Sequence, residues 1–200
     1  MRVMGRIFFL LLFSLFFVSG CSVKYKTVVK MRKGDIESVK LSKEDRKKLK
    51  NLKRDLISLS SETNKAEAQK LAYIAVTYPV YLAKKYSLVY PPQFHNFLVN
   101  IRLRDKGLCY QWVEDMMRYI KCKKFKTFDF HWAVANRGKL NEHNVIVVTA
   151  KNRPFESGIL LDAWRNSGRI FWTKVVKDKD YSFKEWKSKS RWLSSYGCIP

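Results

Sequence analysis

The amino-acid sequence predicts an α+β fold in which N-terminal helices pack on an antiparallel sheet. Apolar residues recur at helical spacing between residues 41 and 121, whereas beyond Lys121 they alternate or form short apolar runs. Helices first and strands after is the order typical of this class. The chain has 200 residues, 46% of them hydrophobic, which suits one domain with a sizeable core. We expect that domain to span residues 41–200.

Four helices are expected, starting near residues 43, 64, 92 and 109. The first is Lys-rich and ends near Ile57. Ser42 is its expected N-cap, and Asp45 stands where a capping box has Glu or Gln. Pro79 interrupts or kinks the second helix.

Four strands are expected at 128–134, 144–150, 158–162 and 170–176. They are separated by turn-forming segments at 136–138, 152–154 and 166–168. The tail from residue 181 to 200 is aromatic and basic. It either packs across the sheet or meets a membrane interface, and the sequence leaves both open.

The first 20 residues have the pattern of a signal peptide. Arg2 and Arg6 precede an almost wholly apolar run at 7–18, which is too short for a membrane span. The following Val-Ser-Gly-Cys at 18–21 resembles the bacterial lipobox. That resemblance implies cleavage before Cys21 and lipid (palmitate among the acyl groups) on its thiol and amino group. An ordinary signal peptide and a retained membrane helix are the alternatives.

A basic segment at 21–40 follows Cys21 and is expected to be a lipidated tether with at most a short strand at Val28–Val29. Ser22 rather than Asp follows the cysteine, which in the enterobacterial form of the lipobox rule implies the outer membrane. We therefore expect a lipid-anchored protein of the bacterial cell envelope, at the outer membrane and facing the periplasm.

The chain is strongly basic, with a formal net charge of +23. Such a charge usually indicates nucleic acid, but an exported lipoprotein meets little of it, so no nucleic acid is expected. The expected partners are the membrane through Cys21 and anionic lipid, lipopolysaccharide or cell-wall polymers. Alternatively, the lysines only keep the protein soluble and close to an anionic membrane.

Three cysteines besides Cys21 lie in the expected domain: Cys109, Cys122 and Cys198. An odd number in an oxidising compartment leaves at least one thiol without an intramolecular partner. A Cys122–Cys198 disulfide would clip the C-terminus to the core and leave Cys109 free. Pairing of Cys109 with either of the others would block the site described next.

Cys109, His143 and Asp162 are the candidate catalytic residues. Cys109 opens a helix just after Gly107, where free N–H groups and the helix dipole favour a thiolate. His143 begins one apolar strand and Asp162 ends the next, so an antiparallel sheet could bring them to one edge. Thiol, imidazole and carboxylate then make a nucleophile, its base and its orienting group. His131, inside a strand, is the rival base.

Each of these residues also has a structural reading. Cys109 could be a buried structural cysteine, His143 a solvated turn residue, and Asp162 a cap for the loop that follows it.

The pattern Gly107-x-Cys109-x-x-Trp112, followed by His143 and Asp162, resembles the papain-like fold group and, within it, the transglutaminase-like cysteine proteins. The resemblance covers about residues 105–176. It implies that Cys109 is the nucleophile, His143 the base and then the acid, and Asp162 the orienting group. Transglutaminase-like sequences often have an aromatic residue soon after the histidine, whereas Asn144 and Val145 follow here.

The side chain that would complete an oxyanion hole is not identified by the sequence. Asn100 and Arg104 are possible, and Gln111 is a weaker choice if the helix turns it away. The Asp-Cys-Ser and Gly-His-Val signatures of NlpC/P60 and CHAP amidases are absent.

We expect an envelope-anchored thiol hydrolase or acyltransferase that acts on amide or ester bonds of a peptide, a protein or a peptidoglycan stem peptide. No metal or cofactor is expected. The alternative from a different class is a catalytically silent, basic binding or assembly module of the envelope. A third possibility is a purely structural lipoprotein with Cys109 in a disulfide.

Overall fold

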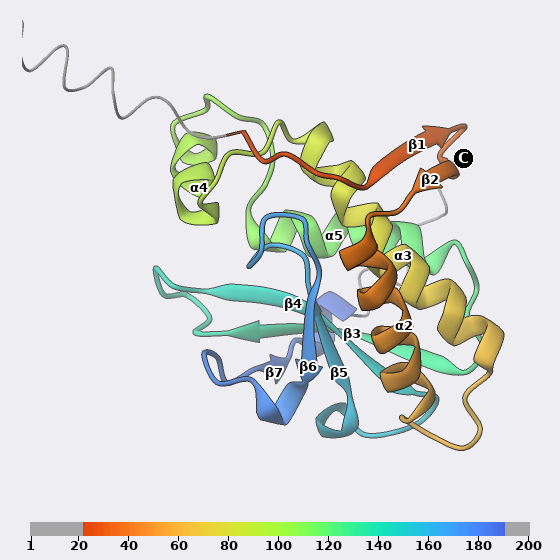
Figure 1. Ribbon diagram of the computed structural model, residues 1–200. Coiled ribbons are helices and arrows are strands. Elements are labelled where there is room, and N and C mark those ends of the chain that lie inside the picture. Colours follow the sequence, from red (N-terminus) through yellow and green to blue (C-terminus); the bar gives the residue numbers. More distant parts are fainter. Residues whose placement is uncertain (1–21, 191–200) are drawn as a thin grey trace, which may run out of the picture.

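The computed structural model describes residues 22–190, in which helices are followed by an antiparallel sheet (Figure 1). The helices are α2 (Lys43–Ile57), α3 (Lys65–Lys85), α4 (Pro92–Asn100) and α5 (Cys109–Lys121). The strands of the sheet are β3 (Phe128–Ala135), β4 (His143–Ala150), β5 (Ile159–Asp162), β6 (Phe171–Lys174) and β7 (Lys184–Glu185). The strand order is β6-β5-β4-β3-β7, and every neighbouring pair is antiparallel. The expected α+β class is therefore confirmed.

Strand β4 lies at the centre of the sheet, and all eight of its residues are buried. Ile146 and Val148 belong to the core between the sheet and the helices, together with Trp132 of β3. Val145 and Val147 alternate with them and pack in a second cluster on the other face. Burial on both faces explains why this strand is a continuous apolar run in the sequence.

The helices on one face of the sheet begin as their sequences predict. Ser42 caps α2, because its Oγ accepts a hydrogen bond from the backbone N–H of Asp45 at 3.0 Å. Asn64 caps α3 in the same way. Helix α3 continues past Pro79, which is buried within it, and contacts α2, α5 and β1. Tertiary packing thus keeps α3 continuous at Pro79, so the expected interruption does not occur.

The segment expected to be a tether is more ordered than its sequence suggested. Residues 28–40 form a hairpin of β1 (Val28–Arg32) and β2 (Asp35–Lys40), which packs beside α3 (Figure 1). Thr27 is fully buried, and its hydroxyl donates to Asp45 at 2.5 Å. Before the hairpin, Ser22 makes an isolated antiparallel bridge with Val89. The chain therefore joins the domain at residue 22.

The remaining differences lie in the C-terminal half. Two short 3₁₀ helices, Phe155–Ser157 and Val175–Lys177, flank β5 and β6, and β7 is an additional edge strand. The part of the tail from 181 to 190 lies within the described residues, whereas 191–200 lies outside them, as do the expected signal peptide and Cys21. No helix between residues 22 and 190 is long and apolar enough to cross a membrane.

Candidate functional site

Cys109, His143 and Asp162 come from three elements that meet at one end of the sheet. Cys109 is the first residue of α5, His143 the first of β4 and Asp162 the last of β5. Strands β4 and β5 are antiparallel, so the start of one lies beside the end of the other. Helix α5 packs on β4, which places the helix start at the same end.

The loop before Cys109 is fixed by side chains on both sides. Gln111 Oε1 accepts hydrogen bonds from the backbone N–H groups of Gly107 at 2.8 Å and of Leu108 at 3.0 Å. The indole N–H of Trp112 donates to the Gly107 carbonyl at 2.9 Å. The glycine and tryptophan of the Gly-x-Cys-x-x-Trp pattern thus hold the turn that presents Cys109.

Gly107 is required by close packing as well as by its backbone. Its φ is +140°, and a Cβ built on it would lie 2.1 Å from Nε2 of His95. His95 is fully buried, donates from Nε2 to the Lys106 carbonyl at 2.8 Å, and accepts at Nδ1 from the Val89 N–H at 3.3 Å. His95 is therefore a structural residue that holds the loop in front of α5.

His143 and Asp162 form a buried pair. The imidazole N–H at Nε2 donates to Oδ2 of Asp162 over 2.7 Å, and each residue is only 1% exposed. Asp162 Oδ1 also accepts from the backbone N–H groups of Trp164 and Arg165, at 3.0 and 2.9 Å. The Arg165 guanidinium donates to Oδ2 over 2.9 Å. Asp162 thus caps the following loop and orients the imidazole at once.

The electrostatics of this pair favour charge on both partners. Burial alone would lower the pKa of His143, but the Asp162 carboxylate and the Cys109 side chain together raise it to about 9. Burial would likewise raise the pKa of Asp162, yet His143 and Arg165 hold it below its usual range. An imidazolium–carboxylate pair is therefore the form expected at neutral pH.

The thiol of Cys109 lies beside this pair. It is 8% exposed, is a free cysteine, and is close enough to His143 to raise the pKa of the imidazole. Among the described residues, Nδ1 of His143 has no hydrogen-bond partner that meets the usual geometry. Nδ1 is therefore the nitrogen available to the sulfur, because Nε2 is already bonded to Asp162.

Asn144 also reaches the sulfur, although it was not among the candidate residues selected from the sequence. The indole N–H of Trp132 donates to its Oδ1 at 2.6 Å, which turns the Nδ2 amide toward Cys109. Nδ2 lies 3.7 Å from Sγ and donates to Oε1 of Glu142 at 2.9 Å. The alternation of side chains along a strand is the only sequence feature that could have indicated Asn144. Asn144 follows His143 directly, and its side chain faces the helices that cover the sheet.

Aromatic side chains enclose the imidazole of His143. The ring centroids of Trp164, Tyr181 and Phe183 lie 4.9, 4.7 and 5.8 Å from that of His143. Arg165 joins the end of β5 to the segment that carries these aromatic residues, because it bonds Asp178 at 2.8 Å as well as Asp162. Of the two possibilities that the sequence left open for the aromatic tail, packing on the sheet is the one seen at Tyr181 and Phe183.

The other residues singled out in the sequence lie elsewhere. His131 bonds Glu185 at 2.8 Å and Thr149 at 3.0 Å, so both of its ring nitrogens have partners other than Cys109. Arg104 bonds the carbonyls of Ser87 and Leu103, and Asn100 is exposed.

Cys122 is disulfide-bonded, and its partner is not Cys109, which is free. Cys198 lies outside the described residues, so the Cys122–Cys198 pairing stays a prediction, as does lipidation of Cys21.

Two cavities in the described part of the chain lie away from the thiol. One of about 560 Å³ lies beside Tyr181 and Phe183, and one of about 610 Å³ lies beside Tyr119 and Lys123. Neither is lined by Cys109 or His143. Among residues 22–190, no group of three or more His, Cys, Asp or Glu side chains is placed to hold a metal ion.

Comparison with known proteins places the chain in no family. No protein-family model, no curated protein and no solved structure matches it. The protein described by the fold and the site is thus an α+β domain with a buried cysteine, histidine and aspartate at one end of its sheet.

Proposed function

We propose that the protein is an envelope-anchored thiol hydrolase or acyltransferase with a papain-like, transglutaminase-like core. The observation that carries the proposal is the order of contacts at the sheet end: Asp162 bonds Nε2 of His143, and the free Cys109 lies on the imidazole's other side. A carboxylate that fixes the imidazole beside a thiol is the arrangement that nucleophilic catalysis by cysteine needs.

In the proposed reaction, the Cys109 thiolate attacks the carbonyl carbon of an amide or ester. The new C–S bond gives a tetrahedral oxyanion, and the Cys109 backbone N–H, in the first turn of α5, can donate to it. The proton on Nδ1 of His143 passes to the leaving amine or alcohol as its bond to carbon breaks. Water or an amine then attacks the thioester, returns a proton to His143 and releases the thiolate.

The proposed substrate is a peptide, a protein side chain or a peptidoglycan stem peptide. The proposed location is the outer membrane, facing the periplasm, with the chain held by lipid on Cys21. The strongly basic composition supports an anionic surface close by, either lipid, lipopolysaccharide or a cell-wall polymer.

Alkylation of the purified full chain by iodoacetamide, followed at the Cys109 peptide by mass spectrometry, tests the nucleophile. We expect alkylation at pH 6.5 to slow at least tenfold in His143→Ala, because the imidazolium that stabilises the thiolate is lost. His131→Ala is the matched control and should change the rate less than twofold. Equal rates in all three proteins would contradict the proposal.

The reaction of the protein with p-nitrophenyl acetate tests acyl transfer separately. We expect one equivalent of p-nitrophenolate to be released rapidly, with an acetyl adduct on Cys109 that is absent in Cys109→Ser. A reactive thiol that never accepts the acetyl group would argue against an acyltransferase.

The second candidate function is a catalytically silent, basic binding or assembly module of the envelope. It is favoured by closure of the site, since Cys109 is 8% exposed and His143 only 1%. Slow alkylation at every pH, together with binding to anionic vesicles that is unchanged in Cys109→Ala, would support the module over the enzyme.

A further inference from the structure

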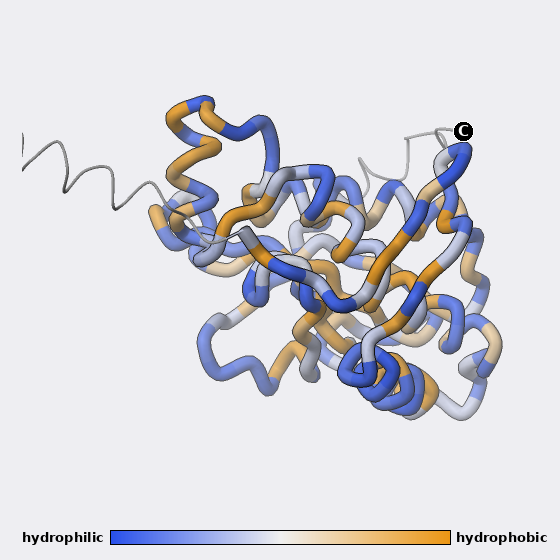
Figure 2. The backbone as a smooth tube through the Cα atoms, turned by 45° about the horizontal axis from the view of Figure 1, so that its top comes forward, coloured by the Kyte–Doolittle hydropathy of each residue, from blue (hydrophilic) through white to orange (hydrophobic). Residues whose placement is uncertain are grey.

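Helix α4 and the chain on either side of it expose a cluster of large apolar side chains. Tyr90 is 59% exposed, Phe97 54%, Ile101 46% and Leu103 62%. Hydrophobic and hydrophilic positions are interleaved along this part of the chain (Figure 2). Exposed apolar residues gathered in one region indicate a contact surface rather than ordinary scatter. We call residues 90–104 the α4 segment.

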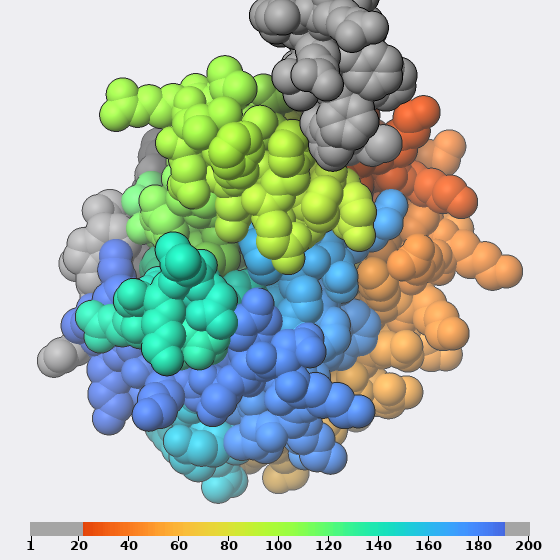
Figure 3. Space-filling view, turned by 90° about the vertical axis from the view of Figure 1, so that its left-hand side faces the viewer, coloured from red at the N-terminus to blue at the C-terminus, as the bar shows by residue number. Residues whose placement is uncertain are grey.

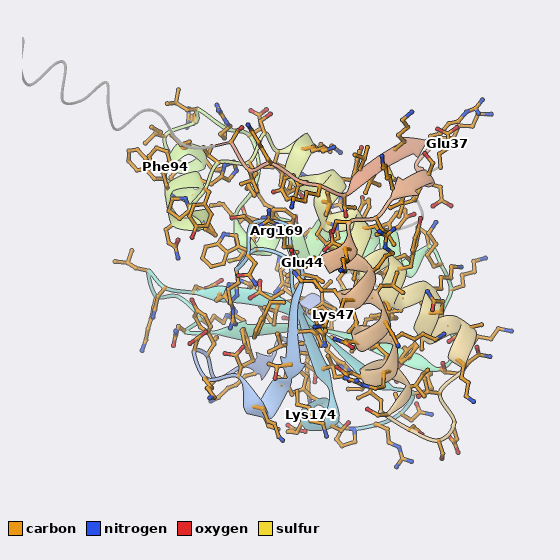
Figure 4. All side chains as sticks on the ribbon, viewed as in Figure 1. Glu37, Glu44, Lys47, Phe94, Arg169 and Lys174 are labelled. Carbon is orange, nitrogen blue, oxygen red and sulfur yellow. The ribbon has the colours of Figure 1, made fainter. Side chains whose placement is uncertain are left out.

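The tip of the β3–β4 hairpin continues this surface. Leu140 is fully exposed, and the tip lies below the α4 segment on the same face of the molecule (Figure 3). Phe94 of α4 lies on the side of the molecule away from α2 (Figure 4), and its ring stacks on Phe97 at 6.3 Å. Two structures far apart in the sequence thus present apolar side chains in the same direction.

The start of the described chain lies at the α4 segment. Ser22 pairs with Val89, directly before Tyr90. Cys21 is the next residue toward the N-terminus, so one peptide unit separates it from Ser22. A lipid on Cys21 would therefore be tethered close to the exposed apolar cluster.

The charges on this face are mainly positive. Arg102 stands between Ile101 and Leu103, and Arg137 and Lys139 precede the exposed Leu140. Asp105 is the exposed acidic residue next to the α4 segment. Apolar side chains interleaved with arginine and lysine match a bilayer interface, where rings and aliphatic groups enter the acyl boundary and cations meet lipid phosphates.

We propose that the α4 segment and the β3–β4 tip dock on an anionic phospholipid bilayer. The docking orients the end of the sheet that carries Cys109 toward the membrane surface, because Glu142, whose carbonyl contacts the Cys109 thiol at 3.7 Å, follows the tip. The proposal rests on the proposed location in the envelope but not on the reactivity of Cys109. Its partner is the lipid itself, not another protein.

Hydrophobic photolabelling tests this orientation. The full chain is reconstituted in vesicles of phosphatidylcholine and phosphatidylglycerol (3:1) that contain a phospholipid with an acyl-chain diazirine. After illumination and proteolysis, we expect adducts in residues 90–104 and 136–142. Val176 is 64% exposed but lies outside both segments, so its peptide is the internal control and should remain unlabelled.

Variants then identify the side chains responsible. Phe97→Asp with Ile101→Asp should lower the adduct yield in 90–104 at least fivefold, and Leu103→Asp is a second variant outside the helix. Val176→Asp should leave the yield unchanged. Arg102→Glu should lower the yield on anionic vesicles toward that on pure phosphatidylcholine.

Three results would overturn the docking surface. Adducts confined to the first 25 residues would mean that the N-terminus alone holds the membrane. Equal labelling of the Val176 peptide would mean that no face is selected. Crosslinking through 90–104 that needs no vesicles and rises with protein concentration would assign the surface to a second copy of the chain. The alkylation rate of Cys109 is independent of all three, so this failure is distinguishable from failure of the proposed function.

Discussion

His95 and His143 are equally buried, with 0% and 1% exposure, and each lies against the loop and helix start that present Cys109, His95 at Lys106 and His143 at Cys109 itself. Burial lowers the pKa of His95, although the Lys106 carbonyl opposes the change. Burial acts in the same direction on His143, but the Asp162 carboxylate and the Cys109 side chain together raise its pKa to about 9. The two imidazoles therefore carry different charges at neutral pH.

This difference shows that the partner, and not the burial, decides what a histidine does here. His95 bonds backbone groups only, and a neutral imidazole can serve both as donor to Lys106 and acceptor from Val89. His143 bonds a carboxylate and leaves Nδ1 to the thiol. The first arrangement holds a loop, whereas the second suits proton transfer.

Removing the carboxylate should have the largest effect. Asp162→Asn leaves the His143 imidazolium without its buried counter-charge and removes one of the three carboxylates bonded to Arg165, which should cost about 3–5 kcal/mol in the free energy of unfolding. Urea denaturation at pH 7 measures the change. Asp180→Asn is the matched control: Asp180 also bonds Arg165, but its side chain is 66% exposed, so the loss should stay below about 1 kcal/mol. Equal losses in the two variants would mean that the buried His143–Asp162 pair stabilises the fold no more than an exposed ion pair does.

Gly107→Ala should cause the next largest loss of stability, because it disturbs the packing of His95 against the loop before Cys109. The new Cβ would meet the imidazole at 2.1 Å, and φ is +140°. Overpacking and backbone strain together should cost about 3 kcal/mol. Gly138→Ala has a φ of +77° but nothing within 4 Å of the added atom, so only about 1 kcal/mol is expected. Thermal unfolding compares the two, and a Gly107→Ala loss no greater than that of Gly138→Ala would rule out the close packing.

Titration of the two histidines measures the difference between their pKa values directly. In NMR spectra of the imidazole Cε1–H groups, His143 should titrate near pH 9 and His95 below 6.5. Stability from charged His143 is fully present below about pH 6.5 and should fall by about 2–3 kcal/mol as pH rises through 9. His95 has the opposite sign, because the unfolded chain binds its proton first, so its contribution is lost as pH falls below 6.5. His143→Asn should abolish the alkaline loss, and its persistence would assign the loss to another group.

Much of the fold could be predicted from the sequence because its patterns are local. The N-cap and the apolar stripe of the helix at Lys43–Ile57 are both present in its sequence, and the apolar run at β4 indicated a strand. The β1–β2 hairpin could not be predicted in this way, because its ordering depends on packing against α3 and on the buried Thr27–Asp45 bond. Such contacts are set by tertiary structure and leave no periodic signal.

The candidate site likewise contains residues that the sequence could predict and residues that it could not. Cys109, His143 and Asp162 could be selected because each stands at the end of an element, and ends of neighbouring antiparallel strands coincide. The cover of Tyr181 and Phe183 comes from a segment without regular structure, so its position could not be read from spacing. The contacts of Gln111 could not be predicted from spacing either, because its side-chain oxygen turns back onto its own helix start.

Asn144 should show the smallest effect and separates support of the fold from support of the sulfur. Asn144→Ala leaves the buried indole N–H of Trp132 without its acceptor, which should cost about 1–2 kcal/mol in urea denaturation. Asn144→Asp keeps that acceptor but replaces the amide beside Cys109 with an anion. It should therefore slow alkylation of Cys109 at pH 6.5 more than Asn144→Ala does. If Cys109 is alkylated in both variants at the rate of the wild-type chain, Asn144 only accepts the hydrogen bond of the Trp132 indole and does not affect the sulfur. Asp162 is then the one polar partner that distinguishes the surroundings of His143 from those of His95.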